Sequence, residues 1–143
     1  MEAAVRVKKA HQWDPECWKW PVPDLSHLHG KEPLAVEKKA EKTLKKWQAG
    51  RCAMCGNIES LLTDHDHKTG LIRGLLCRSC NINEGVQHGA DMPLERYRNR
   101  SPAMILGITV RYFDHFHGRY AEPEEEQDIE EFLRRAAKFV NEL

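Results

Sequence analysis

The periodicity of apolar positions first predicts a helix over residues 33–48, PLAVEKKAEKTLKKWQ. Its apolar side chains recur near one face, namely Leu34, Ala40, Leu44 and Trp47, and lysines cover the rest. Gly50 provides a stop signal. The helix is expected to pack with the cysteine-containing region and to present its lysines to phosphate. Alternatively, the lysines form a solvated face on which Glu37 and Glu41 are their spaced ion-pair partners.

In the segment after this helix, apolar and polar residues alternate with the shorter period of a β-strand. Residues 60–76 contain SLLTDHDH and LIRGLL on either side of Lys68-Thr69-Gly70, which predicts a hairpin whose turn is closed by the glycine. A short helix is expected to follow, through Asn81 to about Gln87.

Helical patterns return after Pro93. We expect one helix over Leu94 to Arg100, and a second that begins at Pro102, behind a Ser101 cap, and runs to about His117. A last helix carries an apolar stripe formed by Ile129, Phe132, Leu133, Ala136, Phe139 and Val140. Such a stripe is typical of a core contact or an oligomer interface.

Residues 11–23 show no helical or strand period. They contain three tryptophans and three prolines, which predicts an irregular arm that must dock to bury its rings. The arm either packs on its own core or on a second subunit, or it contacts DNA.

A chain of 143 residues has room for one domain with appended arms. We divide it into an irregular arm (1–32), the basic helix (33–50), a central unit (51–90) and C-terminal helices with an acidic segment (91–143). The pattern predicts an α+β fold that is mostly helical. Its apolar runs are far shorter than a membrane span, and no signal peptide is visible, so we expect a cytoplasmic protein with no membrane partner.

The net charge is zero, from 22 basic and 22 acidic residues. It conceals an asymmetry, because residues 1–120 hold 19 basic against 14 acidic residues and residues 121–143 hold 3 against 8. The larger part of the chain is therefore modestly basic, which keeps a nucleic-acid partner open.

Four of the five cysteines form two C-x-x-C pairs, Cys52/Cys55 and Cys77/Cys80. In a reducing compartment this spacing is typical of a tetrahedral zinc site. Four thiolates leave no position for water, so such a zinc would be structural and the chemistry would come from other residues. Cys17 is left over.

Asp64-His65-Asp66-His67 lies between the two cysteine pairs. On a regular strand Asp64 and Asp66 would point one way and His65 and His67 the other. Alone, such a stretch can equally decorate an exposed hairpin tip.

The full pattern of cysteines, DHDH and glycines is more specific than the DHDH stretch alone. C-x-x-C-G, then DHDH-x-x-x-G-x-x-R-G-x-L-C-x-x-C-N-x-x-x-G, resembles the phage recombination endonuclease VII family, a zinc-containing branch of the HNH, or His-Me finger, nucleases. The resemblance covers Cys52 to Gly85. It implies a ββα-metal unit, which is a hairpin followed by a helix with a divalent ion between them, here pinned by the four cysteines.

The resemblance implies a role for each matching residue. Asp64 and Asn81 would hold one Mg²⁺ or Mn²⁺, His65 would be the general base, and His67 and Glu84 would support them. Oxygen ligands suit a hard ion, and a neutral histidine can take a proton from an attacking water. Asp66 would orient a histidine or form a salt bridge at the turn.

Three basic residues are candidate DNA contacts: Lys68, Arg73 and Arg78. An arginine on so small a hairpin can instead cover the zinc site. His88, His115 and His117 are isolated and are left out of the site.

The predicted function is a metal-dependent DNA endonuclease in a phage or its bacterial host. The family implies cleavage of branched DNA, such as four-way junctions, by a homodimer. Two alternatives remain: a site-specific restriction-type or nicking HNH enzyme, and a non-catalytic zinc module that contacts DNA or protein.

Overall fold

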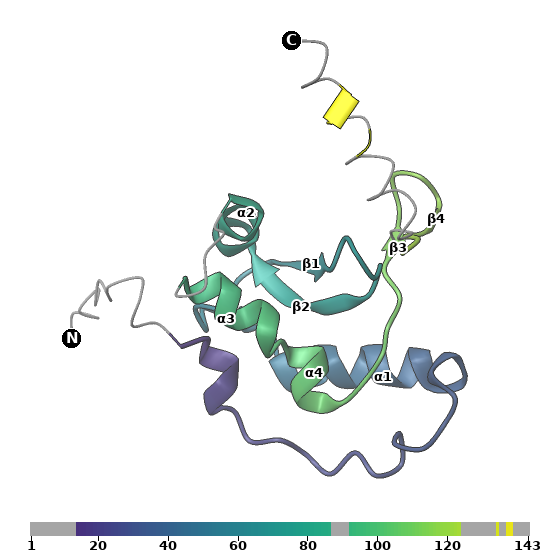
Figure 1. Ribbon diagram of the computed structural model, residues 1–143. Coiled ribbons are helices and arrows are strands. Elements are labelled where there is room, and N and C mark those ends of the chain that lie inside the picture. The colour runs from purple at the N-terminus through teal and green to yellow at the C-terminus, as the bar shows by residue number, and fades with distance from the viewer. Residues whose placement is uncertain (1–13, 87–91, 124–133, 135–136, 139–143) are drawn as a thin grey trace, which may run out of the picture.

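The structure is a computed structural model, and it describes residues 14–86, 92–123, 134, 137 and 138. In Figure 1 a central hairpin lies between α2 on one side and α1 on the other, and a second small hairpin lies near its turn. The elements in chain order are η2 (Glu16–Lys19), α1 (Pro33–Gln48), β1 (Leu61–His65), β2 (Ile72–Cys77), α2 (Arg78–Val86), α3 (Pro93–Asn99), α4 (Pro102–Leu106), β3 (Phe113–Asp114) and β4 (Arg119–Tyr120). The chain therefore has a small α+β fold.

Helix α1 forms where the sequence predicts it. Pro33 occupies its first turn, and it ends at Ala49 and Gly50, which both have positive φ (49° and 77°). Ala40 and Leu44 are buried as expected, but Leu34 is 63% exposed, so its placement on the apolar face is wrong. At 100° per residue Leu34 lies about 120° around the helix from Ala40, which turns it to solvent.

The predicted central hairpin is present. β1 and β2 are antiparallel, with Leu61 opposite Cys77 and Asp64 opposite Gly74, and the register shifts between Asp64 and His65. Gly70 in the turn has a φ of +72°, and a Cβ there would lie 2.7 Å from the carbonyl oxygen of Ala121. A side chain at this position would therefore be both strained and blocked by the chain that crosses the turn.

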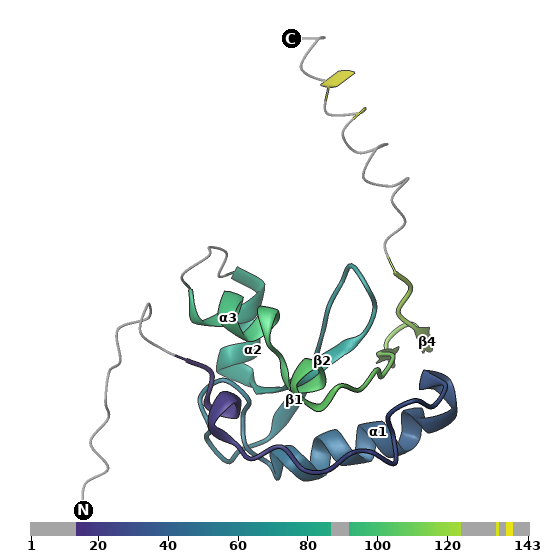
Figure 2. The same cartoon turned by 60° about the horizontal axis from the view of Figure 1, so that its bottom comes forward.

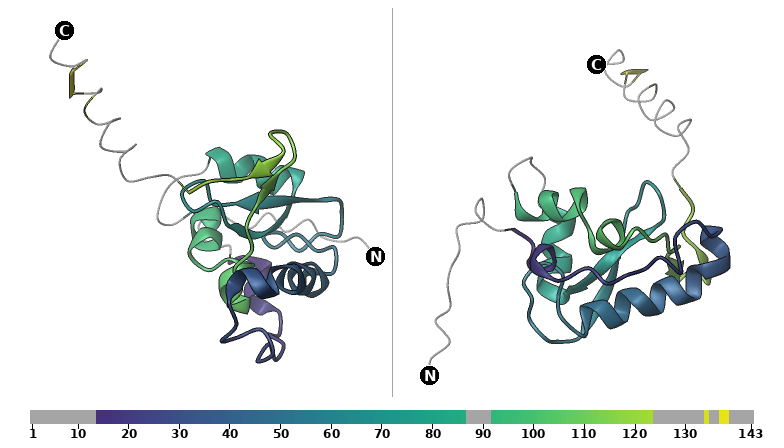
Figure 3. Two further views of the ribbon diagram at one scale, coloured as in Figure 1. Left: turned by 90° about the vertical axis from the view of Figure 1, so that its right-hand side faces the viewer. Right: turned by 90° about the horizontal axis from the view of Figure 1, so that it is seen from below.

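Helix α2 follows β2 without a break and α3 lies close to its predicted bounds, whereas the predicted helix to His117 is wrong. Helix α4 ends at Leu106, because Gly107 adopts a left-handed conformation (φ 65°). The chain then runs extended beside the turn of the first hairpin, where the amide of Ile72 donates to the oxygen of Val110 (2.8 Å). It continues into the β3–β4 hairpin (Figure 3, left).

The residues of the Trp-rich arm that are described, 14–23, pack on the protein's own core. The indole of Trp18 donates to the oxygen of Arg100 (2.9 Å), and the ring of Trp20 packs edge-on against Trp47, with centroids 5.2 Å apart. The amide of Cys17 donates to the oxygen of Ala53 (3.0 Å), which attaches η2 to the first cysteine loop. Trp13 lies outside the described residues.

Two buried clusters meet at the central hairpin. One surrounds the cysteine pairs and includes Cys17, Cys52, Leu76, Leu94 and Tyr97. The other joins α1 to the hairpin and to α4, through Leu25, Leu28, Ala40, Leu44, Ile72, Leu106 and Val110. Figure 2 and the right panel of Figure 3 show the preceding chain running alongside α1. The hairpin is thus fixed from both sides.

The buried amide of Gln48 adds a polar link between α1 and β2. Its Oε1 accepts from the amide of Leu75 (2.8 Å) and its Nε2 donates to the oxygen of Leu75 (2.9 Å). A side-chain amide here makes the two hydrogen bonds that a neighbouring strand would make.

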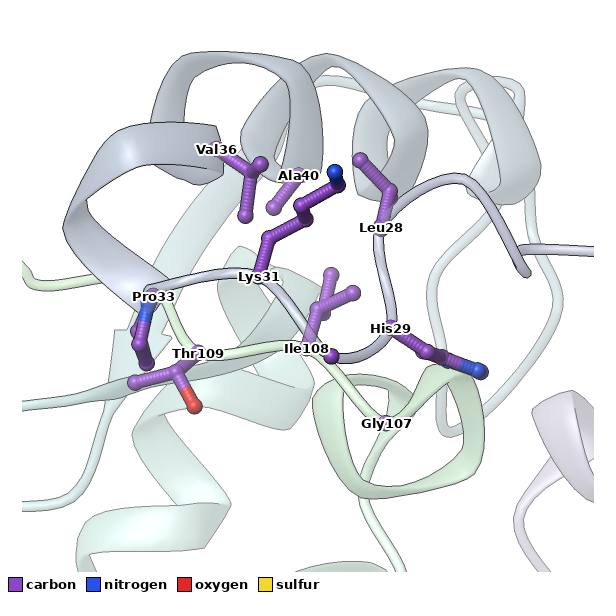
Figure 4. A pocket seen from close by; sticks show the side chains of 10 residues that line it. Leu28, His29, Lys31, Pro33, Val36, Ala40, Gly107, Ile108 and Thr109 are labelled. Atoms are coloured by element: carbon purple, nitrogen blue, oxygen red, sulfur yellow. The ribbon is translucent and has the colours of Figure 1, made fainter.

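All six residues of the predicted C-terminal stripe, from Ile129 to Val140, lie outside the described residues. Among the described residues no helix combines the length and apolar character needed to cross a membrane. A cavity of about 380 Å³ lies between residues 28–31, the start of α1 and residues 107–109 (Figure 4). None of the predicted site residues lines it.

Candidate metal centre and active site

The four predicted zinc ligands converge. Cys52 and Cys55 come from a tight loop, closed by hydrogen bonds from the Gly56 amide to the oxygen of Cys52 (2.8 Å) and from the Cys52 amide to the oxygen of Asn57 (2.9 Å). Cys77 ends β2 and Cys80 lies in the first turn of α2. The sulfur atoms of all four lie within 4.8 Å of one another, and the thiols are free rather than oxidised to disulfides.

This geometry fits a tetrahedral zinc ion. With Zn–S bonds of about 2.3 Å, the sulfurs of such a site lie about 3.8 Å apart, and the Cys55 and Cys77 sulfurs are separated by 3.8 Å. The chemistry of the set agrees. A hydrogen bond from the Cys80 thiol lowers the pKa of Cys52 to about 4, whereas burial raises the pKa of Cys55 to about 12. A divalent cation is what allows several thiolates to be held together.

Cys17 is separate from this set. It is fully buried behind the first cysteine loop, and burial raises the pKa of its thiol to about 12. It is therefore a neutral packing residue, which accounts for the cysteine left over in the sequence.

Asp64 forms a buried ion pair. Its side chain is 3% exposed, and the guanidinium of Arg73 donates from Nε to Oδ2 (2.9 Å) and from Nη2 to Oδ1 (3.1 Å). Burial raises the pKa of Asp64 even though Arg73 opposes that effect. The carboxylate is thus held in one orientation by an internal cation.

Arg73 also joins β2 to the helices. Its Nη2 donates to Glu84 Oε1 on α2 (2.8 Å) and to the oxygen of His65 (3.1 Å). Arg98 of α3 contacts the same Glu84 oxygen at 3.2 Å. Asp64, Arg73, Glu84 and Arg98 are therefore connected by ion pairs, and we call them the Asp64–Arg73–Glu84–Arg98 cluster; Arg98 also pairs with Glu95 of α3 (2.8 Å).

His65 lies at the edge of this cluster. Its ring stacks on Tyr112, with centroids 3.8 Å apart and planes 5° from parallel, and the ring of His67 is 4.6 Å away. Burial lowers the pKa of His65, and the neighbouring His67 lowers it further. The ring is therefore oriented by a flat aromatic contact and favours its neutral form.

Asn81 lies elsewhere on the unit. It lines a groove of about 390 Å³, between α1 and the chain around β3, together with residues that include Glu37, Thr63, Arg111 and Tyr112. The carboxylate of Asp64 is held by Arg73, and Asp64 is not among the residues that line this groove. The structure thus brings Asp64, His65 and Glu84 together, whereas Asn81 lies in the groove that Tyr112 also lines.

The three predicted DNA contacts differ in exposure. Lys68 in the turn and Arg78 at the start of α2 are exposed, as are His67 and five lysines of α1 (Lys38, Lys39, Lys42, Lys45 and Lys46). Arg73 is 8% exposed and directed at the two carboxylates.

Sequence reasoning missed Tyr112, because its segment was assigned to a helix. The signals were present: Gly107 is a helix stop, and Val110, Tyr112 and Phe113 favour strands. Its contact with His65 depends on chain pairing that no local pattern specifies.

The fold and the site define a small α+β protein in which four cysteines, with the geometry of a zinc site, lie where the β1–β2 hairpin meets α2. A sequence profile described as recombination endonuclease VII matches residues 27–142. Because that match covers most of the chain, this protein belongs to the recombination endonuclease VII family.

Two curated phage proteins share part of the sequence. The gene 59 proteins of Mycobacterium phages L5 and D29 are each 54% identical to this chain over 39 residues, which is 24% of this chain and 24% of each relative. The match thus spans about a quarter of those relatives. No solved structure matches the chain.

Proposed function

We propose that this protein is a metal-dependent endonuclease that hydrolyses phosphodiester bonds in DNA. The observation that carries the proposal is the placement of His65, stacked on Tyr112 and next to the buried Asp64–Arg73 pair, in a member of a nuclease family. His65 takes a proton from the water that attacks phosphorus. His67, whose ring lies next to that of His65, and Glu84 on α2 support this role.

The lowered pKa of His65 suits a general base. A base must be unprotonated to act, and burial favours the neutral ring at physiological pH. Tyr112 restricts the ring to one plane, so little reorientation precedes proton transfer.

The oxygen donors of the three predicted residues are of the kind that one Mg²⁺ or Mn²⁺ prefers. Asp64 and Glu84 offer carboxylate oxygens and Asn81 an amide oxygen, the ligands that hard cations prefer, and each Asp64 oxygen has a second lone pair beyond the one that Arg73 uses. We assign Asp64 and Asn81 as the protein ligands. When bound, the ion would stabilise the charge that develops on the phosphate and the leaving 3′ oxygen.

Arg73 makes this binding dependent on the substrate. Asp64 and Glu84 are already paired with arginines, so their carboxylates offer a divalent ion little unneutralised negative charge. A DNA phosphate supplies the missing negative charge. We therefore expect weak binding of the ion by the protein alone and tighter binding in the presence of DNA.

The proposed substrate is branched DNA, cut by a homodimer that places one active site on each of two strands. A site-specific restriction-type or nicking HNH activity is the alternative for the same site, and a non-catalytic zinc module is the alternative for the four cysteines alone. Exposed lysines on α1, with Lys68 and Arg78, are the proposed phosphate contacts.

A cleavage assay separates these functions. The zinc-loaded protein is incubated with supercoiled plasmid, a four-way junction and a linear duplex, each with and without Mg²⁺. Preferential junction cutting supports the proposal, and discrete bands from linear duplex support a site-specific enzyme. Absence of cutting on all three would leave only the zinc module.

Variants then test the residue roles. His65→Ala is expected to abolish cleavage while zinc content and DNA binding stay unchanged, and the exposed, remote His27→Ala serves as the matched control. Asp64→Asn and Asn81→Ala are expected to shift the Mg²⁺ titration of cleavage to higher concentration. An unaltered titration would remove the ligand assignment.

A further inference from the structure

The β3–β4 hairpin presents an aromatic ring to solvent at its tip. Phe116 is 93% exposed, and the flanking rings of Phe113 and Tyr120 are 36% and 40% exposed. Phe113 and Tyr120 pack edge-on at 5.2 Å, and His117 packs on Phe116 at 5.1 Å. A single exposed apolar residue is common, but here an aromatic cluster projects from one short turn.

The tip is held in a fixed shape. The carboxylate of Asp114 accepts hydrogen bonds from the amides of Phe116 (2.9 Å) and His117 (3.2 Å). The Gly118 amide donates to the oxygen of Asp114 (2.8 Å), with Gly118 at a φ of +67°. Phe116 is therefore carried by an ordered turn, which lowers the entropy cost of placing its ring against a partner.

The base of the hairpin is anchored beside the proposed general base. The guanidinium of Arg111 donates to both oxygens of Glu37 on α1 (2.9 and 3.0 Å) and lies 3.9 Å from the Tyr120 ring centroid. The next residue, Tyr112, stacks on His65, and its amide donates to the oxygen of Gly70 (2.9 Å). The left panel of Figure 3 shows the two hairpins side by side. A ligand that contacts Phe116 therefore binds to the same hairpin whose base contacts His65.

The charge around the tip suits a polyanion. Residues 111–120 contain two arginines and one acid, Asp114, whose carboxylate is engaged in the turn and by the ring of His117. Arg119 of this hairpin is exposed, and so is Lys68 in the turn of the first hairpin. An exposed aromatic ring on the same hairpin as an exposed cation is an arrangement that can bind a nucleobase while the cation meets a phosphate.

We infer that Phe116 stacks on a nucleobase of the bound DNA and inserts at a step where the bases are already unstacked, such as a branch or mismatch. This inference rests on the proposed function, because it names the feature of DNA that the same site selects. Insertion costs least where pairing or stacking is already lost, so the ring favours irregular DNA over continuous duplex.

The test uses the full zinc-loaded chain without added divalent ion, so that DNA is bound and not cut. The probe is a duplex with a central mismatch, carrying 2-aminopurine beside it, and a fully paired duplex of the same sequence is the comparison. The variants are Phe116→Ala, Phe116→Trp as the stacking-competent replacement, and Ile58→Ala as a control at another exposed apolar residue (81% exposed).

Phe116→Ala is expected to weaken binding to the mismatched duplex about tenfold or more and to lose the change in 2-aminopurine fluorescence, because stacking on one ring is removed. Phe116→Trp should restore both, and Ile58→Ala should bind like the unaltered protein. Binding of Phe116→Ala within twofold of the unaltered protein would overturn the inference. So would a loss of dimer for Phe116→Ala in sedimentation, since the ring would then contact a second copy.

Cleavage assays separate this inference from the proposed function. If the unaltered protein cuts no DNA but Phe116→Ala still loses mismatch binding, the nuclease proposal fails and the base contact stands. If the unaltered protein cuts and Phe116→Ala binds and cuts equally well, the base contact fails and the nuclease proposal stands.

Discussion

The guanidinium of Arg73 holds both carboxylate oxygens of Asp64, at 2.9 and 3.1 Å, where the register of the central hairpin shifts. Asp64 pairs with Gly74 and His65 pairs with Ile72, so Arg73 is the extra residue of a β-bulge. A bulge redirects a side chain that regular alternation would send to the other face. Here it directs a cation at the acid next to the proposed base.

Removal of this cation is expected to destabilise the fold. Arg73→Met leaves Asp64 buried without its partner, which should lower the free energy of unfolding by about 3–5 kcal/mol. The double variant Arg73→Met/Asp64→Asn should recover much of that loss, because position 64 is then neutral and Glu84 keeps its ion pair with Arg98. Urea denaturation of the zinc-loaded proteins measures both.

The exposed Arg78→Met is the control for this pair, since it changes the same residue type close by and should alter stability by less than about 0.5 kcal/mol. Equal stability of Arg73→Met and the unaltered protein would show that Asp64 does not depend on Arg73.

The local parts of this unit are predictable from the sequence, and its long-range pairings are not. The period of apolar residues is enough to predict α1 and the hairpin, and the spacing of the cysteines predicts the metal centre. The bulge at Arg73 is not predictable, because it depends on the register between two strands. The extended chain after Gly107 pairs with Ile72 and Gly70, and this pairing overrides the helical pattern of residues 108–117.

Gln48 illustrates the same limit. In the sequence pattern of α1, Gln48 looks like any other polar residue of the helix. In the structure it is fully buried, and its side-chain amide bonds both the N–H and the carbonyl oxygen of Leu75. Gln48→Ala should lower the free energy of unfolding by about 1–3 kcal/mol, because the Leu75 amide is left buried without an acceptor. Thermal or urea unfolding, with exposed Lys42→Ala on the same helix as the control, provides the measurement. A loss no larger than that of the control would contradict this role.

The four-cysteine centre should account for most of the stability of the unit. We expect one zinc per chain by elemental analysis, lost in Cys77→Ser. Binding of a structural zinc contributes on the order of 10 kcal/mol, comparable to the whole stability of a small domain, so the variant should unfold. Cys17→Ala is the matched control, because Cys17 is equally buried but outside the set of four, and it should retain zinc. A folded, zinc-free Cys77→Ser protein would count against the site.

Tyr112 is expected to act as a positioning residue for His65. Tyr112→Ala removes the ring that stacks at 3.8 Å, so His65 can rotate away from the attacking water. The cleavage rate constant should fall about ten- to a hundredfold with KM for DNA unchanged, as is typical when a catalytic group loses its orientation. Tyr112→Phe keeps the ring and should retain the rate. A rise in KM alone, or equal loss in both variants, would show instead that Tyr112 contacts DNA through its hydroxyl.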